Sequence, residues 1–227
     1  MIITAIHSKS TGSTHAIAQM LIEEIKKIRS NAEINQFVVA GFQPCAGCFT
    51  CFSKGEEFCP HYESAHPIIS SIEQSDVVIL DSPTYCMGIS GAMKSFLDHM
   101  CYRWFAHRPH PSMATKIGVA ISTTGGVGAK GVTKALKSQF FGWSAAKYYS
   151  LSFAVMGRSW DEIKESRKKE IIRAVRKTAR KVAEKSSKAK RSLYLRFILT
   201  AMRIVQKQND WFPLDKAWWQ EQGWIKS

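Results

Sequence analysis

The sequence predicts an α/β protein built on a parallel sheet with helices on both faces. Two observations lead to this prediction. Short, continuously apolar segments rich in Val and Ile alternate along the chain with segments of helical periodicity. The apolar segments also lack polar–apolar alternation, which indicates strands buried on both faces, as in parallel sheets.

Five strands and their connecting helices can be placed along the chain. The strands are expected at residues 1–7, 34–39, 77–81, 116–122 and 147–156. Helices are expected to begin near residues 14 and 132 and to span residues 67–74, 91–99, 161–190 and 192–207. Five strands joined in this way predict a doubly wound, flavodoxin-like sheet of order 2-1-3-4-5, with ligands at the carboxyl ends of the strands.

Composition excludes several other classes of protein. Of the 227 residues, 45% are hydrophobic, which is too many for a disordered chain. No apolar run approaches the roughly 18 residues that a membrane-spanning helix needs. The first residues, MIITAIHSKSTG, have neither the basic start nor the cleavage site of a signal peptide. We therefore expect a cytoplasmic protein with reduced cysteines.

Charge divides the chain into two parts. Residues 158–207 hold 17 Lys and Arg against five Asp and Glu, a net charge of +12, whereas the rest carries only +2. We expect a ligand-binding domain over residues 1–157 and a basic helical extension with a Trp-rich tail over residues 158–227. The extension could make a peripheral contact with an anionic membrane, or fold back on the domain or pair with a second subunit. Nucleic acid is not an expected partner, because no recognised motif accompanies the charge.

Three polar loops follow predicted strands and are candidates for binding a cofactor. The first, SKSTGST, precedes a helix whose N-terminus can hold a phosphate. Its hydroxyl groups and the absence of GxGxxG favour the monoester phosphate of FMN. Its candidate ligands are Ser8, Ser10, Gly12, Ser13 and Thr14. The second loop offers an aromatic ring and a thioether for the flavin ring, at Pro83, Thr84, Tyr85, Cys86 and Met87. The third permits close backbone approach at Thr123, Thr124, Gly125 and Gly126.

The second loop and its following helix, SPTYCMGISGAMKSFLDH, resemble the flavin loop of NAD(P)H-dependent FMN reductases of the multimeric-flavodoxin-like group. The residues that match the family pattern are Pro83, Tyr85, Met93, Lys94, Phe96 and Asp98. His99 stands where Arg is usual. The resemblance covers residues 1–156, and it implies a flavin-dependent oxidoreductase that binds FMN and accepts electrons from NAD(P)H.

Four of the six cysteines, Cys45, Cys48, Cys51 and Cys59, are separated by two, two and seven residues. Such spacing can hold a 4Fe–4S cluster with a more distant fourth ligand. It also resembles the compact motif of iron–sulfur flavoproteins, a branch of the same family, which implies these four thiolates as cluster ligands near FMN. Two alternative interpretations of the four cysteines stay open, namely a zinc site and thiols that bind no metal. The Asp-Asp that usually follows the fourth cysteine is absent. His61 and His66 are expected near the segment or at the surface.

The sequence thus predicts an FMN-dependent electron-transfer oxidoreductase in which a 4Fe–4S cluster relays electrons to or from FMN. One alternative is an NAD(P)H-dependent FMN or quinone reductase without a cluster. Another is a noncatalytic redox carrier that docks on an acidic partner or a membrane. No acid–base pair stands out, so no catalytic residue is assigned. We expect a small-molecule or protein redox partner and a homo-oligomer.

Overall fold

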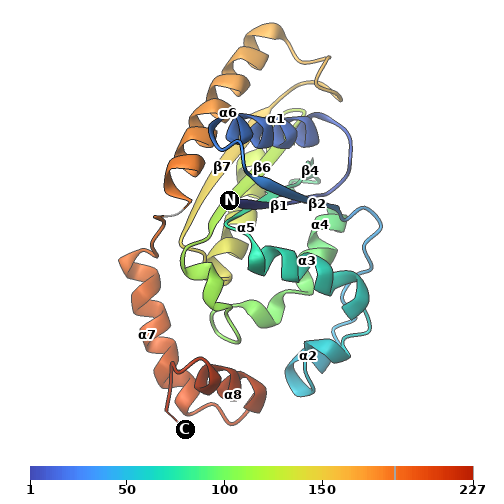
Figure 1. Cartoon of the computed structure of the whole chain (residues 1–227). Coiled ribbons are helices and arrows are strands. Elements are labelled where there is room, and N and C mark those ends of the chain that lie inside the picture. The colour runs from blue at the N-terminus through green and yellow to red at the C-terminus, as the bar shows by residue number, and fades with distance from the viewer. Residues whose placement is uncertain (187, 227) are drawn as a thin grey trace.

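A five-stranded parallel sheet lies at the centre of the computed structural model, which describes residues 1–186 and 188–226 (Figure 1). Its strands are β1 (Ile2–His7), β2 (Glu33–Val38), β3 (Val77–Asp81), β6 (Ile117–Thr124) and β7 (Lys147–Ala154). Their order is β2-β1-β3-β6-β7, and neighbouring strands are parallel. The predicted doubly wound, flavodoxin-like fold is confirmed.

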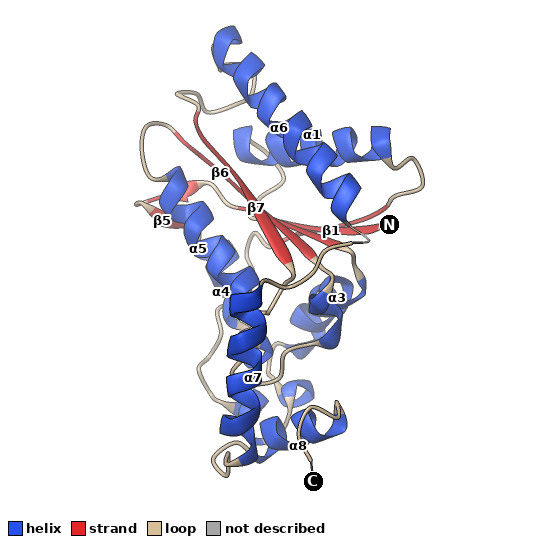
Figure 2. Ribbon diagram, turned by 90° about the vertical axis from the view of Figure 1, so that its left-hand side faces the viewer, coloured by secondary structure: helices blue, strands red, loops and turns tan. Residues whose placement is uncertain are grey.

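Helices cover both faces of the sheet (Figure 2). One face carries α1 (Ser13–Ile28) and α6 (Glu165–Lys185), and the other carries α3 (Tyr62–Gln74), α4 (Gly91–Asp98) and α5 (Ala129–Gly142). Successive residues of a strand point into the hydrophobic cores on opposite faces of the sheet, as strand geometry requires. Ile3 and Ile79 pack toward α1 and α6, whereas Ile6 and Leu80 pack toward the other helices.

Two predicted helices have different bounds in the structure. The helix expected at residues 67–74 begins at Tyr62, so Pro67 lies inside α3 rather than at its first position. The helix expected at residues 161–190 spans only Glu165–Lys185, because Ile163 enters the core from the non-helical segment before it and is 2% exposed. Ser187, in that predicted helix, and Ser227, in the predicted extension, lie outside the described residues.

The first helix of the basic extension belongs to the helical layer of the sheet. Ile171, Val175 and Val182 of α6 are fully buried in the core that contains α1. The remaining face of α6 is exposed and carries the Lys and Arg residues. The domain boundary at residue 157 stays a prediction, but the contacts of α6 tie it to the preceding residues.

The rest of the extension folds back on the protein below the sheet (Figure 1). It consists of α7 (Leu193–Lys207) and an unpredicted helix, α8 (Pro213–Glu221). Gln206 of α7 donates a hydrogen bond to the Ala106 carbonyl (2.7 Å), and the Trp219 indole donates to the His107 carbonyl. Among the described residues, no helix combines the length and apolarity needed to cross a membrane. A peripheral contact needs no spanning helix, so the expected contact with a membrane surface stays a prediction.

Candidate functional site

The three predicted cofactor loops meet at the carboxyl edge of the sheet. Thr14 Oγ1 of the first loop lies 2.6 Å from Thr123 Oγ1 of the third. Thr84 Oγ1 of the second loop lies 3.1 Å from Ser122 Oγ, also in β6. Of the predicted residues, the buried ones are Ser8, Ser13, Thr14 and Thr123, the half-buried ones are Gly12, Pro83, Thr84 and Thr124, and the exposed ones are Ser10, Tyr85, Cys86, Met87, Gly125 and Gly126.

The first loop contains a buried hydroxyl group that lacks a partner. Gly12 caps α1 with φ 90°, a backbone conformation that favours glycine. Ser13 is the first helical residue, and its Oγ is buried with no hydrogen-bond partner among the described residues. Such a group costs about 1–3 kcal/mol. A helix N-terminus favours an anion, so the loop fits the phosphate of FMN.

The second loop contains a small antiparallel hairpin that the sequence analysis missed. It is formed by β4 (Thr84–Tyr85) and β5 (Gly88–Ile89). Cys86 and Met87 occupy its turn with φ of 47° and 64°, as in a type I′ turn. Each costs about 1–2 kcal/mol in a residue other than glycine. The Tyr85 and Met87 side chains are 51% and 63% exposed, so the turn presents an aromatic ring and a thioether that suit a flat heterocycle.

A buried polar group at the base of the first loop was also missed. His7 Nδ1 contacts Asp81 Oδ2, and His7 Nε2 lies 2.9 Å from Gln36 Oε1. Burial opposes protonation, but the Asp81 carboxylate and Gln36 outweigh it and raise the pKa of His7. Ser8 Oγ donates to the Asp81 carbonyl (2.8 Å) and accepts from Ser90 Oγ (2.9 Å). These bonds tie the first loop to β3 and to the end of the second loop. The only sequence signal was a polar residue, His7 or Asp81, at the end of the apolar strands β1 and β3.

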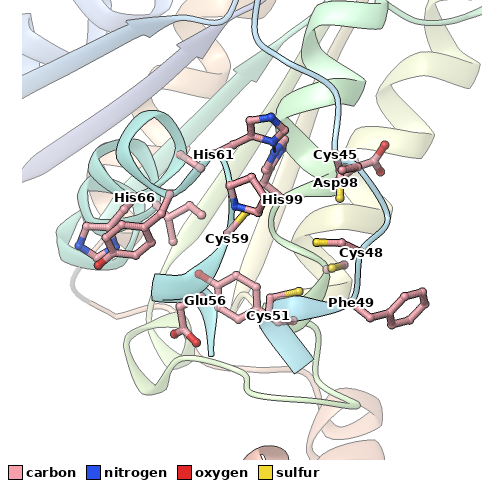
Figure 3. A pocket seen from close by; sticks show the side chains of 17 residues that line it. Cys45, Cys48, Phe49, Cys51, Glu56, Cys59, His61, His66, Asp98 and His99 are labelled. Atoms are coloured by element: carbon pink, nitrogen blue, oxygen red, sulfur yellow. Dashed lines mark hydrogen bonds between the residues drawn. The ribbon is translucent and has the colours of Figure 1, made fainter. Parts of the chain in front are cut away.

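All four predicted metal ligands line one pocket, here called the cysteine pocket (Figure 3). The cysteines and histidines that line this pocket are Cys45, Cys48, Cys51, Cys59, His61, His66, His99 and Cys101. Cys45 and Cys48 are exposed, whereas Cys51 and Cys59 are half-buried. A pocket that several thiols line fits the soft-ligand chemistry of an iron–sulfur cluster.

Neighbouring groups change the acidity of three thiols in the pocket. The Thr50 hydroxyl, 3.1 Å from Cys48 Sγ, lowers the pKa of Cys48 by hydrogen bonding. The neighbouring Cys101 thiol and burial raise the pKa of Cys51, whereas the Cys51 thiol lowers the pKa of Cys101. Cys101 also lines the pocket and is its fifth thiol. It lies outside the cysteine motif, and only the folding of the chain brings it there.

The C-terminal helix supports the cysteine segment. The Arg108 guanidinium donates to the Cys51 carbonyl, and its Nε lies 3.3 Å from Oδ1 of the fully buried Asp215 in α8. The Phe52 ring in α2 (Thr50–Ser53) lies 5.3 Å from the Phe212 ring at the start of α8. Residues about 160 positions apart thus hold the cysteine segment in place.

Helix α4 connects the flavin loops to the cysteine pocket. Its N-cap, Ser90, ends the second loop and contacts Ser8 of the first. Its C-cap, His99, lines the cysteine pocket. Eight residues at a rise of 1.5 Å span about 12 Å. The two predicted cofactor sites therefore lie at the two ends of one short helix.

Comparison with families of known proteins gives a match over residues 1–161 to NADPH-dependent FMN reductase. The chain belongs to the NADPH-dependent FMN reductase family. This is a family of flavin oxidoreductases, so the resemblance found in the second loop is confirmed.

Curated relatives of this FMN reductase family member include iron–sulfur flavoproteins. One from Archaeoglobus fulgidus is 38% identical over 84 residues, which are 37% of this chain and 36% of that protein. Another from Clostridioides difficile is 32% identical over 116 residues, 48% of this chain and 50% of that protein. The chain thus spans about a third to a half of the length of these relatives.

A solved structure supports the fold assignment. The FMN-dependent NADH-azoreductase of Bacillus anthracis, determined in complex with FMN, has a TM-score of 0.59 and 12% identity. The superposition covers 80% of this chain and 99% of that one. At this identity the likeness shows the fold alone.

Proposed function

We propose that this FMN reductase family member is an electron-transfer oxidoreductase with two redox groups, FMN and a 4Fe–4S cluster. Cys45, Cys48, Cys51 and Cys59 would hold the cluster. The observation that supports this most directly is the position of the four-thiol pocket and the flavin loops at the two ends of α4. Bound FMN would supply hydride and electron chemistry, and the cluster single-electron chemistry.

The residues of the flavin loops have separate tasks in this proposal. Ser13 Oγ and the free N–H groups at the start of α1 bind the phosphate. Tyr85 and Met87 would pack on the flavin ring and exclude water from one side. Gly128, with φ 103°, lets the third loop approach the hairpin, because a Cβ at this position would lie 2.8 Å from Thr84 Cγ2. These groups bind and orient FMN, and none of them needs to transfer a proton.

The family name supports NADPH as an electron donor, and the names of the two relatives support the cluster. The second candidate is an NAD(P)H-dependent FMN or quinone reductase without a cluster. The exposure of Cys45 and Cys48 favours it, because exposed thiols form a less protected cluster site. In either case we expect a homo-oligomer, which sedimentation of the purified protein will test. The noncatalytic carrier would bind FMN but oxidise no NAD(P)H.

An anaerobic visible spectrum, with iron, sulfide and flavin quantified on the same sample, tests the proposal. We expect about four irons per FMN. Cys45→Ser should lower the iron content and leave FMN bound, whereas Ser13→Ala should weaken FMN binding and leave the iron content unchanged. Flavin without iron, even after anaerobic reconstitution, would establish the second candidate. No flavin binding at all would refute both.

A further inference from the structure

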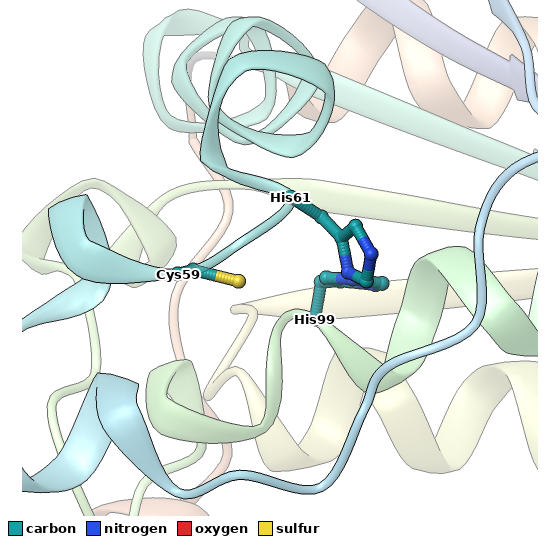
Figure 4. Close-up of side chains that lie close together, drawn as sticks. All are labelled: Cys59, His61 and His99. Carbon is teal, nitrogen blue, oxygen red and sulfur yellow. The ribbon is translucent and has the colours of Figure 1, made fainter.

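Two histidines and one cysteine converge at one end of the cysteine pocket (Figure 4). The side chains of Cys59, His61 and His99 each offer a ligand atom, and these atoms lie within 4.8 Å of one another. His61 Nδ1 lies 3.0 Å from His99 Nε2. Two ligands of a tetrahedral zinc ion stand about 3.3–3.6 Å apart. Side-chain movements of about 1 Å would therefore bring the three atoms to ligand spacing.

His99 is oriented as a ligand histidine would be. Its Nδ1 lies 2.8 Å from the Ser95 carbonyl, which can only accept a hydrogen bond. Nδ1 therefore carries the proton in the neutral ring, and Nε2 presents a lone pair toward His61 and Cys59. A carbonyl partner on the second ring nitrogen is the usual support for a metal-bound histidine. His99 is 6% exposed, and the edge-on Phe42 ring, 5.2 Å away, restricts its rotation.

A second group with ligand spacing, His7, His15 and Asp81, is less suited to a metal. His7 already forms a buried ion pair with Asp81, another member of the group, and the group contains no thiol. In the cysteine pocket, by contrast, one thiol and two imidazole nitrogens face one another. Cys and His together are the ligand set of zinc and similar divalent ions.

We propose that Cys59, His61 and His99 form a binding site for a single divalent transition-metal ion of the zinc class. Three protein ligands leave the fourth position of a tetrahedral ion for water. This site does not depend on the proposed cluster. The two share Cys59, however, so they cannot be filled at the same time.

Proton balance gives the site a measurable signature. Binding requires the Cys59 thiolate, so the thiol proton is released to solvent. The hydrogen between His61 Nδ1 and His99 Nε2 must also leave, and His61 regains a proton on its other ring nitrogen. One proton is therefore released for each ion bound. An ion held by four thiols would release more than one.

Cobalt titration of the full-length protein, purified under reducing conditions without iron, tests the proposal. Co²⁺ replaces zinc and reports thiolate ligation by charge-transfer absorption. We expect one Co²⁺ per chain and one proton released. His99→Gln and His61→Gln should each weaken binding at least tenfold, since supporting residues alone give 10–100-fold effects. Cys59→Ser should abolish the charge-transfer band.

Two variants serve as matched controls. His66 also lines the pocket, but it stacks on Tyr62 (4.5 Å between ring centroids) and lies outside the ligand group, so His66→Gln should bind Co²⁺ normally. Cys48→Ser should do the same. Urea midpoints equal to that of the wild type will show that the histidine variants are folded.

Different variants decide the two proposals. If Cys48→Ser loses iron while His99→Gln retains it, this difference in iron content tests the cluster proposal alone. The divalent site is overturned if the wild type binds no stoichiometric Co²⁺. It is also overturned if Cys48→Ser loses the ion while both histidine variants keep it, because four thiols would then hold it.

Discussion

Replacing Ser13 with alanine is expected to stabilise the flavin-free protein and to weaken FMN binding. The Ser13 Oγ is buried without a hydrogen-bond partner among the described residues, and it lies in the first turn of α1. Removing an unsatisfied buried hydroxyl relieves part of a penalty of about 1–3 kcal/mol. We expect the free energy of unfolding of the flavin-free protein to rise by about 1 kcal/mol.

The effect on FMN affinity has the opposite sign. A hydrogen bond to a charged group contributes about 1.5–3 kcal/mol. Losing one to the FMN phosphate should raise the dissociation constant about 10- to 150-fold. Quenching of flavin fluorescence on binding measures this constant, and urea unfolding followed by tryptophan fluorescence measures stability.

Ser75→Ala is the matched control. Ser75 is as buried as Ser13, at 5% exposed, but its Oγ donates to the Ile72 carbonyl (2.9 Å) at the opposite edge of the sheet. This variant should lose about 1 kcal/mol of stability and keep the FMN affinity of the wild type. If Ser13→Ala binds FMN within twofold of the wild type, or is destabilised as the control is, Ser13 is not a phosphate ligand.

Three further changes test other features of the structure. Asp215→Asn should lower the free energy of unfolding by about 2–4 kcal/mol in urea titrations, because it breaks a buried ion pair with Arg108. A variant as stable as the wild type would show that this ion pair does not support the cysteine segment. Burial lowers the pKa of Lys116 from 10.5 to about 8, so the folded state binds fewer protons than the unfolded state between these values. The free energy of unfolding of the wild type should therefore rise, relative to that of Lys116→Met, by up to about 3 kcal/mol between pH 8 and 10.5. Urea titrations of both proteins across this range measure the difference, and a difference that does not change with pH would refute the prediction. Gly128→Ala, at φ 103° and with its Cβ 2.8 Å from Thr84, should cost about 1–2 kcal/mol of stability and weaken FMN binding in the fluorescence titration, and an unchanged dissociation constant would refute the close approach.

The sequence predicted the sheet because its five strands are apolar runs between helical segments. Strand β6 extends beyond the predicted end at Ser122 to include Thr123 and Thr124, since hydroxyl residues carry little signal for or against a strand. The hairpin of β4 and β5 has only two residues in each strand, which is too short for any periodicity to reveal. Helix boundaries failed where a core residue such as Ile163 enters from a loop.

The candidate sites were predictable only as far as their residues are neighbours in sequence. The spacing of the cysteines from Cys45 to Cys59 is a local signal, and the structure places all of them in one pocket. His99 and Cys101 reach the same pocket from the end of α4, about 40 residues later. The pairing of Arg108 with Asp215 joins residues more than 100 positions apart. Such contacts follow from the packing of helices, which no local pattern encodes.

The support that α8 gives to the cysteine segment has a consequence for the order of events during synthesis. A ribosome adds Cys101 long before Phe212, so all the thiols of the pocket exist while the surface that covers Phe52 is still unmade. Closing a contact across some 160 residues also costs more chain entropy than closing a local one. The cysteine segment of a nascent chain therefore lacks this support while the 111 residues from Cys101 to Phe212 are added, and any metal centre built there would gain the support only after α8 has docked.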